Sequence, residues 1–372
     1  MYNQVRDDVL YIMLYATVIA LAILASCYLL LRDGNAFASD ITPPKRLRRW
    51  AAAFFASLAL NHLWYMPMFY LDSSRDIKTV DLVGGLLDSI TFLPLAINVL
   101  LIMLQDRRRP LWTAFIITAP LTAGSVWCIV SGSYTPPPVF YGFALLLGMG
   151  ITIYIIRALR QYERWLHDNY ADLEHKEVWQ SFTVLGITLM VFVVYALVGN
   201  GPVYQYAMQM ICIIVVGYLL WRVETLSDLS DLSDQKTSGS EADPLFDSEV
   251  ASPDTSKPQN LNMMLQQHCI DTQLYLQHDL TIVQLAKALG TNRFYLSQYF
   301  SNQGINYNAY INNLRIRHFM QLYRQAVANQ RPFTAQQLAH ESGYRSYSTF
   351  GIAFKQRMGQ TVTAWMRDNA KQ

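Results

Sequence analysis

The sequence predicts an all-α fold, in which a bundle of seven transmembrane helices precedes a soluble domain built from two similar helix pairs. Three observations lead to this prediction. Hydrophobic residues make up 52% of the chain, which is high for a soluble protein. The chain changes in character from an apolar part (residues 1–222) through an acidic part (223–260) to a basic part (261–372). The basic part also contains an internal repeat of two helix-forming segments.

The apolar part contains seven runs that are each long enough to cross the hydrocarbon core of a bilayer, which takes about 20 residues of helix. The predicted spans are 9–31, 50–71, 82–104, 111–130, 139–156, 178–199 and 203–220. The first run is too long for a cleaved signal peptide and lacks a basic leader, so we expect it to be retained.

The basic residues of the connections indicate the orientation. If the N-terminus is outside, twelve Lys and Arg residues lie in the inner loops and three in the outer segments. The inner ones are Arg32, Lys45, Arg46, Arg48, Arg49, Arg107, Arg108, Arg109, Arg157, Arg160, Arg164 and Lys176. Cytoplasmic loops carry this kind of excess. The sequence therefore predicts a multi-pass protein of the bacterial cytoplasmic membrane, with its N-terminus outside and its C-terminal domain in the cytoplasm.

The third inner loop is longer than the others and has an apolar periodicity of its own. Near-helical spacing relates Leu159, Tyr162, Trp165, Leu166, Tyr170 and Leu173. We expect the fifth helix to continue here as a helix at the membrane interface.

Four polar residues inside the predicted spans are candidates for a sensing site: Asn61, His62, Asp88 and Asn98. Ionisable groups within lipid are costly and are functional candidates by default. The alternative is a structural role, in which Asp88 is interfacial or pairs with His62 to hold helices together.

Residues 223–260 hold nine acidic residues and two lysines among Ser, Thr, Pro and Gly, which is typical of a flexible tether. The segment opens with a repeat that has leucines at 226, 229 and 232. An alternative to the flexible tether is therefore a short helical extension that pairs two chains.

No motif indicates catalysis or a cofactor. The four cysteines show no metal-ligand spacing, and the chain has no HExxH, no GxSxG and no phosphate-binding glycine loop. We therefore expect a protein that is not an enzyme and has no metal and no cofactor.

The repeat in the basic part is specific. Residues 281–290 (TIVQLAKALG) are matched 53 residues later by residues 334–343 (TAQQLAHESG). Each copy opens with a Thr-x-x-Gln capping box and ends on a Gly suited to a left-handed helix stop. A second helix follows each copy, and the apolar pairs expected to face inward are Leu296 with Phe300 and Phe350 with Phe354. Two unrelated helical hairpins would share none of this.

Residues 261–368 resemble the DNA-binding domain of the AraC/XylS family of transcription regulators. The resemblance rests on 304–316 (GINYNAYINNLRI), which is similar to the start of the family's joining helix, and on its C-terminal signature at 343–344, 350, 354–355 and 359–361. It implies an AraC-type domain with two helix-turn-helix motifs, whose recognition helices enter successive major-groove segments on one face of DNA.

The same resemblance indicates which residues would contact DNA. The matching base-reading positions are Phe294, Ser297 and Gln298 in the first recognition helix and Tyr347, Ser348, Gly351 and Ile352 in the second. Asn292 and Arg293 are expected to reach phosphate or base edges, and Arg345, Lys355 and Arg357 to contact phosphates, unless they are solvated surface residues. The family often has Ser-Arg where this chain has Gly351-Ile352, so we expect the second motif mainly to grip the backbone.

The expected function is regulation of transcription by one chain, in which a membrane sensor domain (1–222) changes promoter binding by the tethered domain (261–372). Expected partners are promoter DNA, the lipid bilayer, an unknown small-molecule or envelope signal, and a second copy in a homodimer on DNA. Two alternatives remain: a transporter or membrane enzyme fused to a DNA-binding domain, and an anchor that holds DNA at the membrane without sensing.

Overall fold

The computed structural model describes residues 8–32, 34–39, 41–134, 137–187, 202–229 and 257–369. Within these ranges the fold is all-α, as predicted, with a single isolated β-bridge between Tyr170 and Thr281. The chain divides into two compact units. The N-terminal unit comprises Met1–Arg160 and Val178–Ser240, and the C-terminal unit comprises Gln161–Glu177 and Glu241–Gln372.

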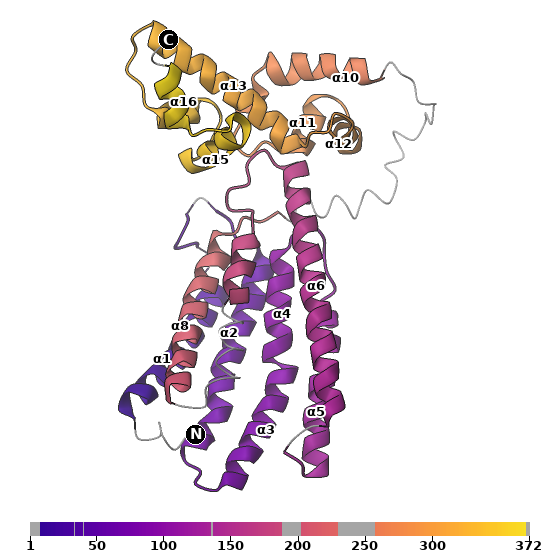
Figure 1. The fold of residues 1–372 in the computed structure, drawn as a ribbon, viewed down its shortest axis with the longest axis vertical. Helices are drawn as coiled ribbons and strands as arrows, with labels where there is room; N and C mark the ends of the chain where they lie inside the picture. Colours follow the sequence, from indigo (N-terminus) through magenta and orange to yellow (C-terminus); the bar gives the residue numbers. More distant parts are fainter. Residues whose placement is uncertain are drawn as a thin grey trace. The chain divides into compact units, whose positions relative to one another are not determined.

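The N-terminal unit is built from helices that run alongside one another (Figure 1). Their bounds are α1 Val9–Leu31, α2 Lys45–Tyr65 with the 3₁₀ turn η2 Met66–Phe69, α3 Ser74–Ile90, α4 Phe92–Met103, α5 Trp112–Ser131, α6 Pro138–Asn169 and α8 Pro202–Thr225. Helix α1 packs against α2 and α8, α2 against α4, and α3 against α5. The last residues of α6 belong to the C-terminal unit.

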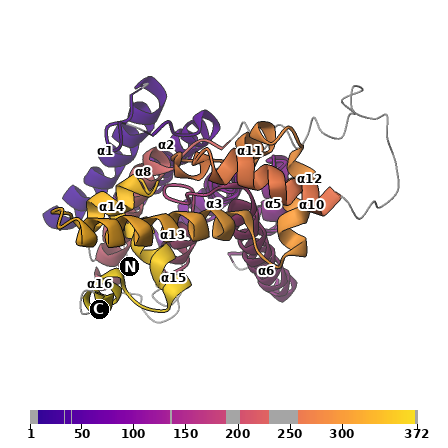
Figure 2. The same ribbon diagram turned by 90° about the horizontal axis from the view of Figure 1, so that it is seen from above.

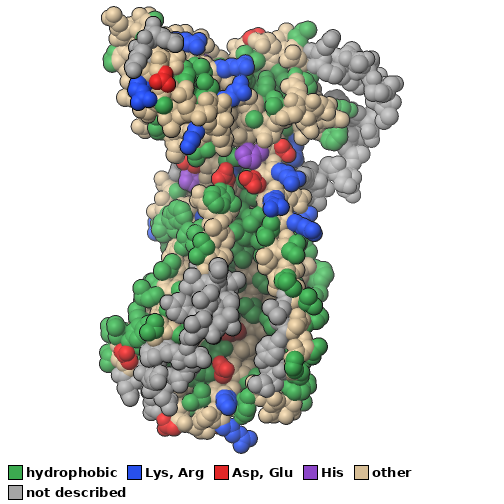
Figure 3. Space-filling model, in the orientation of Figure 1, with side chains coloured by type: hydrophobic (Ala, Val, Ile, Leu, Met, Phe, Trp, Pro, Cys, Tyr) green, Lys and Arg blue, Asp and Glu red, His purple; other side chains and the backbone are tan. Residues whose placement is uncertain are grey.

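Four helical segments are long and apolar enough to cross a membrane: Val9–Leu31, Ser74–Met103, Trp112–Ser131 and Val203–Thr225. At most 33% of each apolar window is buried, and Figure 3 shows hydrophobic side chains over much of the visible face of this unit. These segments correspond to the predicted spans 9–31, 82–104, 111–130 and 203–220. The other three predicted spans lack this support: 50–71 and 139–156 fall in α2 and α6, and 178–199 continues beyond the described residues.

The predicted linker (223–260) begins within the helical bundle. Helix α8 continues to Thr225, and Val223, Leu226 and Leu229 are buried. The first two leucines of the repeat thus pack with apolar neighbours of the bundle. Residues 230–256 lie outside the described residues, and residues 257–260 belong to the following helix.

The C-terminal unit is organised around one long helix, α13, with α11 and α12 toward one of its ends and α14 to α16 toward the other (Figure 2). The bounds are α10 Lys257–Leu265, η3 Gln266–Ile270, η4 Leu274–Leu276, α11 Ile282–Ala288, α12 Arg293–Asn302, α13 Tyr307–Ala328, α14 Ala335–Glu341, α15 Tyr347–Met358 and α16 Val362–Asn369. Two cores result. One contains Leu296 and Phe300, the other Phe350 and Phe354, so the two predicted apolar pairs are confirmed as buried.

The third predicted inner loop continues α6 as expected, but its apolar residues are not exposed for a membrane interface. Tyr162, Trp165, Leu166 and Tyr170 are buried in the C-terminal unit. The periodicity correctly indicated an apolar face. It could not indicate that protein, instead of lipid headgroups, covers that face.

Candidate nucleic-acid interface

The two helix pairs start as the repeat predicts, with one difference. Thr281 Oγ1 accepts the Gln284 amide at 3.2 Å, and Gln284 Oε1 accepts the Thr281 amide at 2.9 Å, which completes a capping box. In the second copy Thr334 accepts the Gln337 amide at 3.0 Å, but the Gln337 side chain donates to Glu341 at 3.0 Å. The second capping box is therefore only half formed, and the Gln337 side chain is directed along the helix toward the carboxylate of Glu341.

The glycine stops of both copies adopt the predicted left-handed conformation. Gly290 has a φ of +63° and Gly343 a φ of +88°. At Gly290 an added Cβ would meet open space, whereas at Gly343 it would lie 2.8 Å from backbone atoms of Leu276. Gly343 thus allows a close backbone approach between the second pair and the turn that precedes the first.

The predicted base-reading residues of the first pair lie along α12 with a mixed exposure. Phe294 is 70% exposed and Gln298 is also exposed, whereas Arg293 and Ser297 are half-buried. Asn292 is the N-cap of the helix, and its Oδ1 accepts the Tyr295 amide at 2.9 Å. Its side chain is therefore engaged in starting the helix.

The predicted residues of the second pair lie on and before α15. Six are exposed, namely Arg345, Tyr347, Ser348, Ile352, Lys355 and Arg357, and Gly351 is half-buried. Arg345 precedes the helix and forms an ion pair with Asp279 at 2.6 Å. This candidate phosphate contact thus already has an acidic partner within the unit.

A buried arginine joins the two halves of the unit, and sequence reasoning did not single it out. Arg315 is 1% exposed, and it donates to the carbonyl oxygens of Tyr275 and Gln277, each at 2.8 Å. Its guanidinium lies over the Tyr344 ring, 5.5 Å from the centroid. Burial lowers the pKa of Arg315, while the neighbouring Tyr344 and Asp172 raise it. The sequence feature that could have indicated its burial is its position at helical spacing between Ile311 and Phe319, which are both buried.

Two of the four candidate sensing residues of the N-terminal unit pair with each other. Asn61 Nδ2 donates to Asp88 Oδ1 at 2.7 Å, and the Tyr65 hydroxyl donates to Asp88 Oδ2 at 3.1 Å. His62 is buried, and its Nε2 pairs with Gln209 at 3.2 Å. The hydrogen bonds of Asp88 thus go to Asn61 and Tyr65, and that of His62 Nε2 goes to Gln209.

Asn98 differs from the other three. Its side chain is fully buried, and within the described residues neither its amide nitrogen nor its amide oxygen has a hydrogen-bond partner.

Comparison with known proteins identifies the C-terminal part of the chain. Residues 285–368 match a family model described as a helix-turn-helix domain. No curated protein and no solved structure matches the chain. The matched residues run from α11 to α16 and include most of both cores. The match supports a helix-turn-helix domain of the AraC type at the C-terminus, which is a kind of domain that binds DNA.

Proposed function

We propose that the protein is a membrane-embedded transcription regulator that binds promoter DNA through its C-terminal domain and responds to a signal in the membrane. The observation that carries this proposal is the presence, on one chain, of a helix-turn-helix domain and four long apolar helices. Apolar surface left in water costs about 25 cal/mol per Å², and lipid removes that cost. A bilayer therefore accounts for the exposed apolar surface of the N-terminal unit.

The C-terminal unit is formed by two separate segments of the chain, and this supports the proposed topology. Gln161–Glu177 and Glu241–Gln372 belong to one compact unit, so both lie on the same side of a membrane. The chain between them must then cross an even number of times. The predicted spans 178–199 and 203–220 provide two crossings, and the DNA-binding domain is in the cytoplasm, where promoter DNA is.

The exposed side chains favour different roles for the two helix pairs, each proposed as one helix-turn-helix motif. In α12, the exposed Gln298 suits an adenine edge and the exposed Phe294 suits a thymine methyl group. In α15, Lys355 and Arg357 are exposed cations suited to phosphates, while Ile352 cannot form hydrogen bonds with its side chain. The first motif would read bases and the second would hold the backbone, with a homodimer extending the site.

The polar residues within the N-terminal unit provide the proposed sensing site. Ionisable and amide groups lie between apolar helices at Asn61, His62, Asp88 and Asn98. Polar groups within a membrane cost free energy, so groups retained there are functional candidates. A bound signal that pairs with these groups would shift the packing of α2, α3 and α4.

The proposal is tested by mapping DNA occupancy across the genome for the tagged full-length protein, with Arg293→Ala as the control. We expect a few sharp promoter peaks that the control lacks, and protein that stays in the membrane fraction after a high-salt wash. A wild-type map without promoter peaks, or a protein found in the soluble fraction, would contradict the proposal, whereas equal peaks for the two proteins would remove Arg293 from the DNA contacts. Peaks that no growth condition changes would favour the anchor without a sensor.

A further inference from the structure

Residues Gln161–Glu177, here called the inserted segment, lie between two predicted spans in the sequence but belong to the DNA-binding unit. Their backbone is tied to the start of the first helix pair. Tyr170 bridges to Thr281, and the Ala171 amide donates to the Leu280 carbonyl at 3.1 Å. Asn308 of α13 donates to the Tyr170 carbonyl at 3.1 Å and to the Ala171 carbonyl at 2.9 Å.

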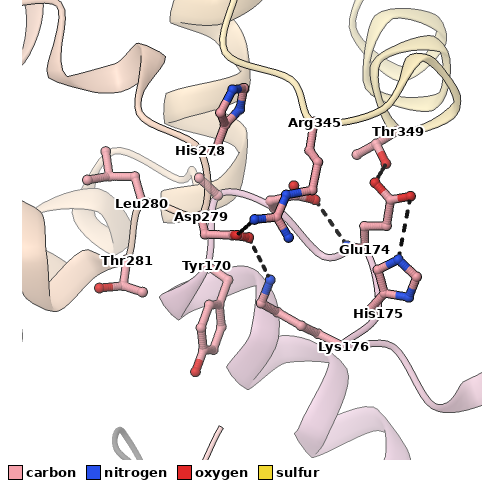
Figure 4. A network of polar contacts seen from close by, with 12 residues as sticks. Tyr170, Glu174, His175, Lys176, His278, Asp279, Leu280, Thr281, Arg345 and Thr349 are labelled. Atoms are coloured by element: carbon pink, nitrogen blue, oxygen red, sulfur yellow. Dashed lines mark hydrogen bonds and ion pairs between the residues drawn. The ribbon is translucent and has the colours of Figure 1, made fainter. Parts of the chain in front are cut away.

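Side chains of the inserted segment reach both helix pairs (Figure 4). Lys176 forms an ion pair with Asp279, just before the first pair, at 3.0 Å, and Asp279 also binds Arg345. Glu174 accepts a hydrogen bond from the Thr349 hydroxyl, in the first turn of α15, at 3.1 Å. The segment therefore spans from the first pair to the second recognition helix.

The segment also brings a carboxylate to the first recognition helix. Asp168 and Ser297 line the same cavity of about 400 Å³. Burial lowers the pKa of Arg293, and the nearby Tyr170 and Asp168 raise it. Acidic side chains of the segment thus lie next to candidate DNA contacts in both recognition helices.

Charge makes the segment a competitor for DNA. It contains five acidic and two basic residues, whereas residues 261–372 contain eleven basic and four acidic residues. A phosphate that approached Ser348 or Arg293 would meet the like charge of Glu174 or Asp168.

We propose that the inserted segment and the DNA backbone compete for the C-terminal unit, so that the segment is a built-in inhibitor which a change in the N-terminal unit withdraws. This inference rests on the proposed function, because it names the regulation of the same DNA site. Lys176 is the anchor that holds the segment in place, and Glu174 and Asp168 are the groups that exclude phosphate. The segment continues α6 on one side and leads toward the predicted span at 178 on the other, so movement of either would pull on it.

The test compares the DNA affinity of full-length proteins in lipid nanodiscs, with a labelled duplex from the strongest occupied promoter at one fixed salt concentration. Lys176→Gln removes the anchor but also a positive charge, and its matched control, Arg164→Gln, removes an exposed positive charge of the same segment. Competition predicts that the Kd falls about tenfold in Lys176→Gln and does not fall in Arg164→Gln. A Kd for Lys176→Gln equal to or above that of its control overturns the inference.

A second pair of variants tests the exclusion of phosphate. Glu174→Gln keeps an acceptor for Thr349 and removes the charge, while Glu163→Gln removes an exposed charge of the same segment. We expect about tenfold tighter binding for the first and a change below about twofold for the second. Equal affinities of the two variants contradict the proposal. Binding by the wild type with no difference among variants leaves the proposed function standing, whereas no binding by any of the proteins overturns both.

Hydrogen exchange gives a readout that needs no substitution. The Ala171 amide is held by Leu280, so a peptide covering residues 170–177 should exchange at least about tenfold faster when the wild-type protein is saturated with the duplex. Unchanged exchange in the DNA-bound protein would show that the segment stays in place, and would overturn the inference.

Discussion

At the scale of single residues, the strongest constraints in the C-terminal unit come from backbone geometry and from buried charge. Both glycine stops have positive φ, but only Gly343 also touches another backbone. Arg315 satisfies two carbonyl groups of the turn that precedes the first helix pair, and it stacks on the Tyr344 ring. The close approach at Gly343 and the reach of Arg315 involve the same turn, so both residues fix the second pair relative to the first.

Substitution of the two glycines separates backbone strain from close packing. Gly290→Ala should destabilise the unit by about 1 kcal/mol, because it only forces a non-glycine residue into positive φ. Gly343→Ala should cost about 2–4 kcal/mol, because its Cβ also meets Leu276 backbone atoms at 2.8 Å. Hydrogen exchange of α13 amides in increasing urea measures both. Equal losses in the two variants would mean that the Leu276 backbone moves away freely.

Local signals were sufficient to predict the helix starts, the glycine stops and the inward apolar pairs, because each depends on neighbours within one or two turns. Arg315 was beyond such reasoning, since a charged residue is normally exposed and its carbonyl partners lie about 40 positions earlier in the chain. The positions of the candidate DNA contacts follow from the family resemblance. The sequence did not indicate that Arg345 forms an ion pair with Asp279 or that Asn292 caps its own helix.

At the scale of elements, α12 and α15 occupy equivalent places in the repeat but present different chemistry. Helix α12 exposes Phe294 and the amide of Gln298, and α15 exposes Tyr347 and Ile352 followed by two cations. The two helices should therefore differ in how substitutions affect specificity and salt dependence.

Gln298→Ala and Lys355→Gln distinguish these two kinds of contact. Gln298→Ala should weaken binding to the specific duplex by about 1–3 kcal/mol and leave non-specific binding unchanged. Lys355→Gln should weaken binding to all sequences alike and reduce the salt slope of log K by about 1. Affinities measured on a specific and a scrambled duplex at several salt concentrations test both. A Gln298→Ala variant that weakens both duplexes equally would remove base reading from α12.

The inserted segment shows a different limit of sequence reasoning at this scale. Its apolar periodicity predicted a helical continuation of α6, which the structure has to Asn169. Its partners, however, are Asp279, Asn308 and Thr349, more than 100 positions away. A pattern within a segment reports which face is apolar, and only the tertiary fold determines what covers it.

At the scale of the whole molecule, the C-terminal unit restricts the topology of the chain more than hydropathy alone does. Hydropathy and length select four helical segments within the described residues. They do not determine whether the chain between the two parts of the C-terminal unit crosses a membrane an even or an odd number of times. Assembly of Gln161–Glu177 with Glu241–Gln372 requires an even number. If the apolar helix Val203–Thr225 crosses the membrane as proposed, a second crossing is expected in the same interval.

Fusions to alkaline phosphatase, which is active only outside the cytoplasm, test this arrangement. A fusion after Asn200 should be active, because residues 178–199 would carry the chain out before α8 returns it. Fusions after Arg109 and at the C-terminus should be inactive, because the three consecutive arginines at 107–109 and the DNA-binding domain stay inside. If the fusion after Asn200 were inactive while the C-terminal fusion was active, α8 would be the only crossing in this interval. The inserted segment would then be separated by the membrane from Asp279 and Thr349, and the C-terminal unit could not form as described.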